Sequence, residues 1–304
     1  MIYTLTLNPA IDYFLKFDNY QEGNLNTPKE TYKLPGGKGI NVSTILKNYN
    51  TESICVGFIG GFTGDFIQSS LENLNLKTKF FKVKGDTRIN IKINNNGLES
   101  EIAGTSPNIS KENLEELLEF FKTTLIKGDI LILSGSVPAS VPKDIYNKII
   151  DTIPEGVKVI LDTRGDPLKF ALKNRVFLIK PNKDEINEFF NTNFTTNEEL
   201  IEAGKKLQTL GAENVLISLG AKGSIFITKD NIYLGNVPTG TLISSNGSGD
   251  SMIGGFVYGL YNNFSLEDSY KFGIASGSAT AFSKGLAQYD ITKSLLKEIK
   301  INIV

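Results

Sequence analysis

The sequence predicts an α/β protein with a mainly parallel β-sheet, and three observations support this class. Short runs rich in valine, isoleucine and leucine recur at 2–7, 53–60, 129–136, 157–163, 176–182 and 215–220. Segments with helical spacing of apolar residues lie between them, such as 110–126 and 196–211. Apolar strands that alternate with helices are typical of a parallel sheet covered on both faces. Polar and glycine-rich stretches follow the strands, where such sheets bind ligands.

The individual elements show the expected local signals. The run at 2–7 has no basic segment before it, so we expect a first strand and not an export signal. The helix at 110–126 opens with Ser110, a typical capping residue, and places Leu114, Leu117 and Phe121 on one face. No apolar run approaches the length of a membrane span.

Two stretches do not fit the alternation of strands and helices. Residues 12–20 and 87–104 resemble antiparallel strands, the second with a hairpin around Asn95, Asn96 and Gly97. We expect segments within about 12–34 and 87–104 to form a small sheet that covers the site as a lid and excludes water. The chain has no linker or repeat, so residues 1–304 are expected to form one domain.

The composition excludes several classes of function. The net charge of −1, from 32 basic and 33 acidic residues, predicts no attraction to nucleic acid or to a membrane. Cys55 is the only cysteine, which fits a reducing compartment, and we expect a cytoplasmic protein. The chain has no histidine, which excludes Ser-His-Asp and Cys-His catalysis and the familiar zinc sites. The groups that remain available for catalysis are carboxylates, lysines, arginines, backbone amides and a hard cation such as Mg²⁺. Phosphoryl transfer uses this set of groups.

The stretch SSNGSGDS at 244–251 is a candidate anion site. If Asp250 starts the following helix, the amides of Gly247, Ser248, Gly249 and Asp250 converge near the positive end of the helix dipole. Asp250 would then lie beside a transferred phosphoryl group and could accept a hydroxyl proton. The alternative is that Asp250 only caps the helix.

Three further glycine-rich or polar stretches have a functional and a structural interpretation. LPGGKGIN at 34–41 is either a backbone cradle with one lysine or a tight turn before a helix. KPNKDE at 180–185 ends a strand and opens a helix, and Glu185 could help to hold Mg²⁺ through water. SLGAKGS at 218–224 reads as a hairpin turn.

Together, these motifs resemble the ribokinase-like carbohydrate kinases of the PfkB family, in its sugar-phosphate branch. The resemblance spans the chain and depends on the order of TLNPAID, GGKGIN, TRIN, SGSVP, KPNKDE, SLGAKG and GSGDS. It implies a three-layer α/β/α fold with a β-lid that often serves as a homodimer interface. It also implies ATP and Mg²⁺ as cofactors.

The resemblance also implies roles for individual residues. Asp250 would be the general base, with Gly247, Ser248 and Gly249 supplying anion-hole amides. The sugar phosphate would be bound by Asp12, Gly36, Gly37, Asn41 and Ser136, with Lys38 and Arg88 suited to its existing phosphate. ATP would contact Lys180, Asn182, Glu185, Ser218, Gly220 and Gly223, with Glu185 on the metal side.

The stretches LNPAID, TRINIKI and GDSMIGGFVYGL most resemble family members that convert fructose 1-phosphate to fructose 1,6-bisphosphate. Tagatose 6-phosphate is the alternative substrate. A sensor that binds a sugar phosphate without turnover is a non-enzymatic alternative, and a nucleotide-binding dehydrogenase a third. The sequence does not favour a dehydrogenase, because TLNPAID follows the first strand where such an enzyme needs a G-x-G-x-x-G motif. Arg164 either reaches a phosphate or faces solvent.

Overall fold

The computed structural model describes all residues from 1 to 304. Its main sheet has ten strands in the order β14 (Ile301–Ile303), β13 (Ile232–Gly235), β12 (Ser224–Ile227), β11 (Ala212–Ser218), β10 (Val176–Ile179), β9 (Lys158–Asp162), β8 (Ile130–Ser134), β1 (Ile2–Thr6), β4 (Ile54–Ile59) and β5 (Lys77–Lys82). The seven strands from β11 to β5 in this order are parallel, and each of the other three is antiparallel to the strand before it in the chain or beside it in the sheet. All six predicted strands are confirmed.

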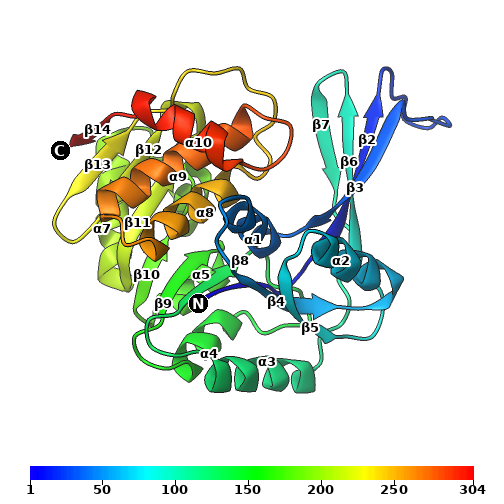
Figure 1. Cartoon of the computed structure of the whole chain (residues 1–304), viewed down its shortest axis with the longest axis horizontal. Coiled ribbons are helices and arrows are strands. Elements are labelled where there is room, and N and C mark those ends of the chain that lie inside the picture. Colours follow the sequence, from blue (N-terminus) through cyan, green and yellow to red (C-terminus); the bar gives the residue numbers. More distant parts are fainter.

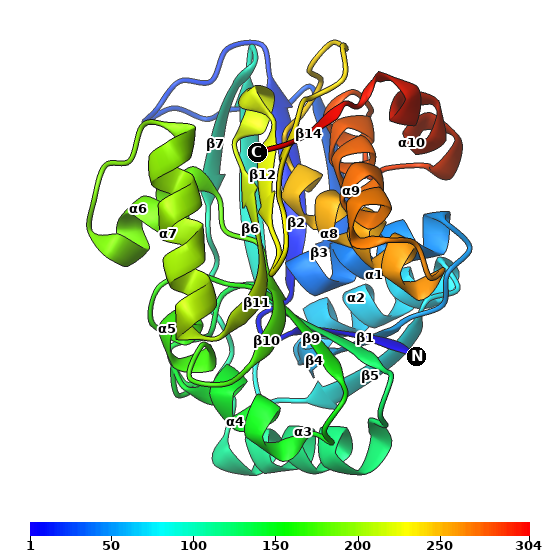
Figure 2. The same ribbon diagram turned by 90° about the vertical axis from the view of Figure 1, so that its left-hand side faces the viewer.

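Helices cover both faces of this sheet, as Figure 2 shows. One face is covered by α3 (Lys111–Thr124), α4 (Ile145–Thr152), α5 (Asp166–Ala171), α6 (Lys183–Phe190) and α7 (Asn197–Leu210). The other is covered by α1 (Lys38–Asn48), α2 (Gly61–Asn73), α8 (Ser248–Tyr261), α9 (Leu266–Ala281) and α10 (Tyr289–Leu295). Two short 3-10 helices are η1 (Gly220–Lys222) and η2 (Leu296–Glu298). No helix is both long and apolar enough to span a membrane.

Alternating side chains of the central strands form two separate cores. On β8, Leu131 and Leu133 belong to the larger core under α3 to α7. Ile130 and Ile132 belong to the second core, under α1, α8 and α9. Because both sets are fully apolar, the strand has no polar face, which is why periodicity alone shows only a continuous apolar run.

The chain changes direction across the sheet next to β1. Strands β4 and β5 extend the sheet on one side of β1, whereas β8 and the later strands extend it on the other. Ligands of open α/β sheets bind beyond the carboxyl ends of the strands at such a switch point. The residues that follow β1 and β8 are therefore placed at the predicted site.

A separate four-stranded sheet forms the lid and projects away from the body (Figure 1). Its order is β3 (Glu30–Gly36), β2 (Ala10–Phe17), β6 (Arg88–Asn95) and β7 (Leu98–Ile102). The predicted hairpin is confirmed, since Asn96 and Gly97 have φ of 50° and 88° at the turn between β6 and β7.

The lid strands differ from the sequence-based prediction in two ways. The first strand runs from Ala10 to Phe17 and does not continue to Tyr20. Strands β2 and β6 pair in parallel and not antiparallel, because the chain passes through α1, β4, α2 and β5 before it returns as β6. Each of the two strands is antiparallel to its own neighbour, β3 or β7.

Candidate active site

Helix α8 begins two residues before Asp250. Its first residue is Ser248, and Gly247 precedes it with a φ of 79°, a left-handed conformation that favours glycine. The sequence-based interpretation had Asp250 start the helix. In the structure, Asp250 lies in the first turn, two residues after the helix begins. No side chain caps the helix.

The backbone amides at this helix end are largely free. The amide of Ser248 donates to the Ser245 carbonyl at 3.2 Å, so it is not available to a ligand as predicted. The amides of Gly247, Gly249 and Asp250 have no partner within the protein. Free amides at the positive end of a helix are suited to bind an anion.

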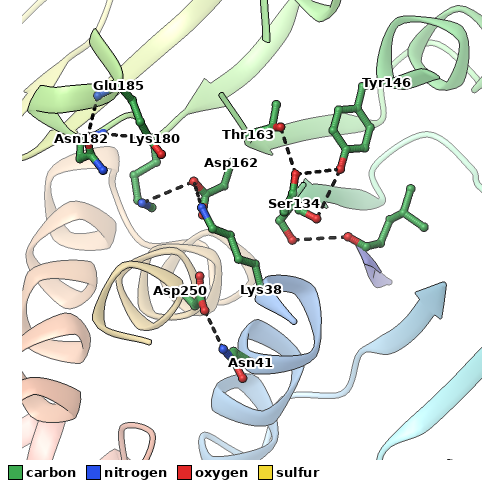
Figure 3. A network of polar contacts seen from close by, with 12 residues as sticks. Lys38, Asn41, Ser134, Tyr146, Asp162, Thr163, Lys180, Asn182, Glu185 and Asp250 are labelled. Carbon is green, nitrogen blue, oxygen red and sulfur yellow. Dashed lines mark hydrogen bonds and ion pairs between the residues drawn. The ribbon is translucent and has the colours of Figure 1, made fainter. Parts of the chain in front are cut away.

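The Asp250 carboxylate is buried and does not cap its own helix. Asn41 donates to its Oδ2 from α1 at 2.7 Å (Figure 3). Burial raises the pKa of Asp250 to about 6, and the negative charge of Asp162 adds to this effect. The hydrogen bond from Asn41 and the charges of Lys38 and Lys180 act in the opposite direction. A carboxyl group with this pKa can accept a proton near neutral pH.

Asp162 connects two lysines beside Asp250. It ends β9, is almost completely buried, and lies 3.1 Å from the Lys38 ammonium and 3.6 Å from that of Lys180 (Figure 3). Burial alone would raise the pKa of Asp162, but the two ammonium groups outweigh it and lower the pKa. The pKa of Lys38 is raised, because nearby carboxylates overcome the effect of its burial.

Asp162 was not among the site residues predicted from the sequence. The signal was present, because a carboxylate directly after the apolar run VKVIL lies at the carboxyl end of a parallel strand. Only the neighbouring Arg164 was singled out, and the structure places that residue at the cleft with an exposed side chain.

The lid contributes polar groups from β2 and β6. Asn90 donates to Asp12 Oδ1 at 2.9 Å, and burial raises the pKa of Asp12. A Cβ at Gly36 would lie 2.6 Å from Asp12 Oδ2, so a glycine leaves the space that this carboxylate fills. Arg88 donates to the Asn8 carbonyl at 3.1 Å, while its buried Nε has no partner.

The residues predicted to contact ATP lie around the carboxyl ends of β10 and β11. The amide of Ser218 donates to the carbonyl of Pro181 at 3.1 Å, which joins the KPN and SLG stretches. Asn182 and Glu185 exchange hydrogen bonds of 2.8 and 2.9 Å as a capping box of α6. This capping box supports the structural interpretation of the pair, although Glu185 also lines the cleft.

A cleft of about 1430 Å³ lies between the lid and the body. Of the predicted residues, it is lined by Asp12, Gly37, Lys38, Asn41, Arg88, Ser136, Glu185, Gly247 and Asp250. Those that do not line it are Gly36, Lys180, Asn182, Ser218, Gly220, Gly223, Ser248 and Gly249. Gly249 nevertheless lies close to the ammonium group of Lys180, because a Cβ at position 249 would be 3.2 Å from its Nζ.

Polar atoms without partners gather around this cleft. Seven buried side-chain nitrogen or oxygen atoms have no hydrogen-bond partner. Five of them belong to the site and its surroundings, namely Thr6 Oγ1, Asn8 Oδ1, Arg88 Nε, Asp162 Oδ2 and Ser248 Oγ. Because buried polar groups are normally satisfied, this cluster points to a polar ligand.

No group of three or more histidine, cysteine, aspartate or glutamate side chains is arranged to hold a metal. Mg²⁺ usually needs only one or two carboxylates, together with water and substrate phosphates. Glu185 lines the cleft and the buried Oδ2 of Asp162 has no partner, so both offer the oxygen ligands that such a metal takes.

Comparisons with known proteins agree with this geometry. The sequence model of the pfkB family carbohydrate kinases matches residues 5–293. The chain is 44% identical to the 1-phosphofructokinase of Bacillus subtilis (strain 168), over 99% of both chains. It is 46% identical to the 1-phosphofructokinase of Borreliella burgdorferi, over 99% of this chain and 98% of that one.

Solved structures share the fold. Escherichia coli phosphofructokinase-2 in complex with fructose-6-phosphate superposes with a TM-score of 0.91 at 28% identity, over 97% of this chain and 98% of that one. Arabidopsis thaliana ribokinase has a TM-score of 0.77 at 20% identity, over 97% and 98% of the two chains. The predicted ribokinase-like fold is confirmed.

Proposed function

The chain belongs to the pfkB family of carbohydrate kinases, and from this premise we propose that it phosphorylates fructose 1-phosphate with ATP to form fructose 1,6-bisphosphate. The observation that carries the chemistry is the buried carboxylate of Asp250 beside free amides at the start of α8, at the wall of a cleft that the lid covers. The relatives named 1-phosphofructokinase support the choice of sugar.

Asp250 is the proposed general base. A carboxylate with a pKa of about 6 is too weak to ionise a sugar hydroxyl before the reaction. It therefore accepts the proton late, as the bond from oxygen to phosphorus forms. Asn41 orients the carboxylate through its hydrogen bond to Oδ2, which leaves Oδ1 to face the hydroxyl.

The free amides of Gly249 and Asp250, with that of Gly247, bind the oxygens of the transferred phosphoryl group. They are fixed by the helix before the reaction starts, so they need not reorganise as negative charge moves. Lys180 and Lys38 add two positive charges near this point, and Asp162 holds both ammonium groups in place. We therefore assign Lys38 to the transferred group, whereas the family resemblance implied a role toward the phosphate that the sugar already carries.

The sugar lies against the lid in this proposal. Asp12, Asn90 and Ser136 bind hydroxyl groups, and the unpartnered Nε of Arg88 faces the existing phosphate. A guanidinium suits this role because its planar fork binds two phosphate oxygens at once. Gly36 and Gly37 allow the backbone to pass close to Asp12 and Thr6, where a side chain would not fit.

In this proposal, ATP binds on the side of the reaction centre that is opposite to the lid. It lies there against Lys180, Asn182, Ser218, Gly220 and Gly223. A divalent metal, which we propose is Mg²⁺, neutralises charge on the nucleotide phosphates. Glu185 and Asp162 are the carboxylates that would hold it.

We also propose a homodimer through the outer face of the lid. The cleft is lined by Arg88, Asn90 and Lys92, so the alternate residues Ile89, Ile91 and Ile93 face outward. On β7, Ile102 lies opposite Ile91 and is 58% exposed. Sedimentation analysis tests this proposal, and Ile102→Lys should yield a monomer. A wild-type protein that sediments as a monomer would contradict it.

A turnover panel tests the function. Fructose 1-phosphate, tagatose 6-phosphate and fructose 6-phosphate are compared by coupled detection of ADP. We expect the highest kcat/KM for fructose 1-phosphate. A preference for tagatose 6-phosphate would replace the substrate and keep the enzyme class, whereas binding without turnover of any of the three would favour a sensor.

A further inference from the structure

The lid carries a second cation on the face that lines the cleft. Lys92 lies on β6 four residues after Arg88, and both side chains line the cleft. Its ammonium is 3.1 Å from Glu101 Oε2 on β7. Glu101 also lines the cleft, so this ion pair belongs to the wall that faces the proposed sugar.

The burial of Lys92 separates it from ordinary surface lysines. Among the lysines that form ion pairs, the side chains of Lys38, Lys92 and Lys180 are 38%, 17% and 5% exposed. The other paired lysines are 48% to 85% exposed. The three least exposed paired lysines therefore all belong to the walls of one cleft or the groups directly behind it.

Two of these three lysines are committed to the reaction centre. Lys38 and Lys180 both contact Asp162, which lies near Asp250. They are therefore not free to bind a phosphate at the far end of the sugar. Arg88 donates one of its nitrogens to the Asn8 carbonyl, so only part of its fork is available. A sugar phosphate carries close to two negative charges, so a further cation on the lid would complement the partly occupied Arg88.

Lys92 is within reach of the sugar subsite. Four residues of a strand span about 13 Å, so Asn90 and Asp12 lie between the two lid cations. Burial raises the pKa of Asp12, and the charges of Lys92 and of Arg88 both counteract this effect. Both cations therefore act on the same carboxylate of the lid, in the part of the cleft that we assign to the sugar phosphate.

We propose that Lys92 is a specificity-determining residue, whose ammonium leaves Glu101 and binds the phosphate that the sugar already carries. This inference rests on the proposed function. Glu101 occupies the ammonium in the free protein, and its side chain is 52% exposed. Half-exposed ion pairs are weak, so a phosphate dianion can replace this carboxylate at little cost. A neutral sugar offers no anion, and it leaves Lys92 with Glu101.

The test measures kcat and KM for whichever sugar phosphate the wild-type protein turns over, together with the KM for ATP. Lys92→Met should raise the KM for the sugar phosphate about 10- to 100-fold, because a hydrogen bond to a charged group is lost. We expect kcat and the KM for ATP to change less than about threefold, on the scale of a weak surface interaction. Lys92→Arg should restore most of the affinity.

Lys16→Met is the matched control. Lys16 lies on β2, lines the cleft and is exposed. The substitution therefore removes the same charge as Lys92→Met, from the same sheet. In Lys16→Met, the KM for the sugar phosphate should stay within about threefold of the wild-type value. Equal effects of Lys16→Met and Lys92→Met would reduce the role of Lys92 to long-range attraction and overturn the inference.

Glu101→Gln gives an independent result that does not depend on the folding of Lys92→Met. It removes the competing carboxylate and should lower the KM for the sugar phosphate about two- to fivefold. An unchanged or higher KM would overturn the inference. A wild-type protein that turns over no sugar phosphate would overturn the proposed function and this inference with it, whereas an unchanged KM in Lys92→Met would overturn the inference alone.

Discussion

Replacing Asp250 with asparagine should make the protein more stable and nearly inactive. The side chain keeps its shape and can still accept the hydrogen bond from Asn41. It can no longer accept the proton of the sugar hydroxyl, so kcat should fall at least about 100-fold. Binding of the sugar phosphate should be kept, because no contact with its phosphate is lost.

The gain in stability follows from the pKa of the buried carboxyl, which is raised from 3.8 to about 6. Below about pH 4 the group is protonated in both the folded and the unfolded state, so it has no effect on stability. Between about pH 4 and 6 the unfolded chain releases its proton first, and the free energy of unfolding falls as the pH rises. Above about pH 6 the full penalty, about 3 kcal/mol, is present.

Asp250→Asn lacks this penalty at every pH. Its advantage over the wild type should therefore be close to zero near pH 4 and about 3 kcal/mol at pH 8. For a chain of this length, this corresponds to a Tm difference of about 5 °C. Urea unfolding at several pH values, together with a coupled ADP assay, measures both effects.

Asp230→Asn is the control, because Asp230 is exposed and does not line the cleft. It should unfold like the wild type at each pH. A kcat within tenfold of the wild type in Asp250→Asn would refute the role as base. Parallel stabilities of Asp250→Asn and the wild type from pH 4 to 8 would refute the assignment of the raised pKa to burial.

Three other substitutions test the surroundings of Asp250 and the lid. Asp162→Asn leaves two lysines without their carboxylate, so the free energy of unfolding should fall by about 3 kcal/mol in urea titrations. It also removes a charge that raises the pKa of Asp250, so the acidic limb of the kcat/KM profile should move to lower pH. Asn41→Ala removes a hydrogen bond that lowers the same pKa, so this limb should move to higher pH. Gly36→Ala places a Cβ 2.6 Å from Asp12 Oδ2, and it should raise the KM for the sugar phosphate with little change for ATP.

Each of these expectations has an outcome that contradicts it. Shifts of the acidic limb in the same direction for Asp162→Asn and Asn41→Ala would show that their effects on Asp250 are misassigned. A wild-type stability in Asp162→Asn would mean that the lysines do not need this carboxylate. Equal increases of both KM values in Gly36→Ala would indicate a general distortion of the cleft.

Local patterns determined the elements correctly where neighbouring residues decide the conformation. Ser110 and Thr196 cap α3 and α7 through hydrogen bonds to residues three positions later, so the sequence contains the complete signal. Asn96 and Gly97 form their turn for the same local reason. The start of α8 was misplaced by two residues, because Gly247 ends the preceding loop without a side-chain cap.

The sequence by itself determined the α/β class, six strands of the main sheet, the helices within 110–126 and 196–211, the candidate motifs and, through their order, the family. Only the tertiary structure showed the Asp162 contacts with two lysines, the parallel pairing of β2 with β6, and the hydrogen bond between Asn41 and Asp250. The last of these joins residues 209 positions apart. Such contacts depend on how distant segments pack, and the raised pKa of Asp250 depends on the burial that this packing creates.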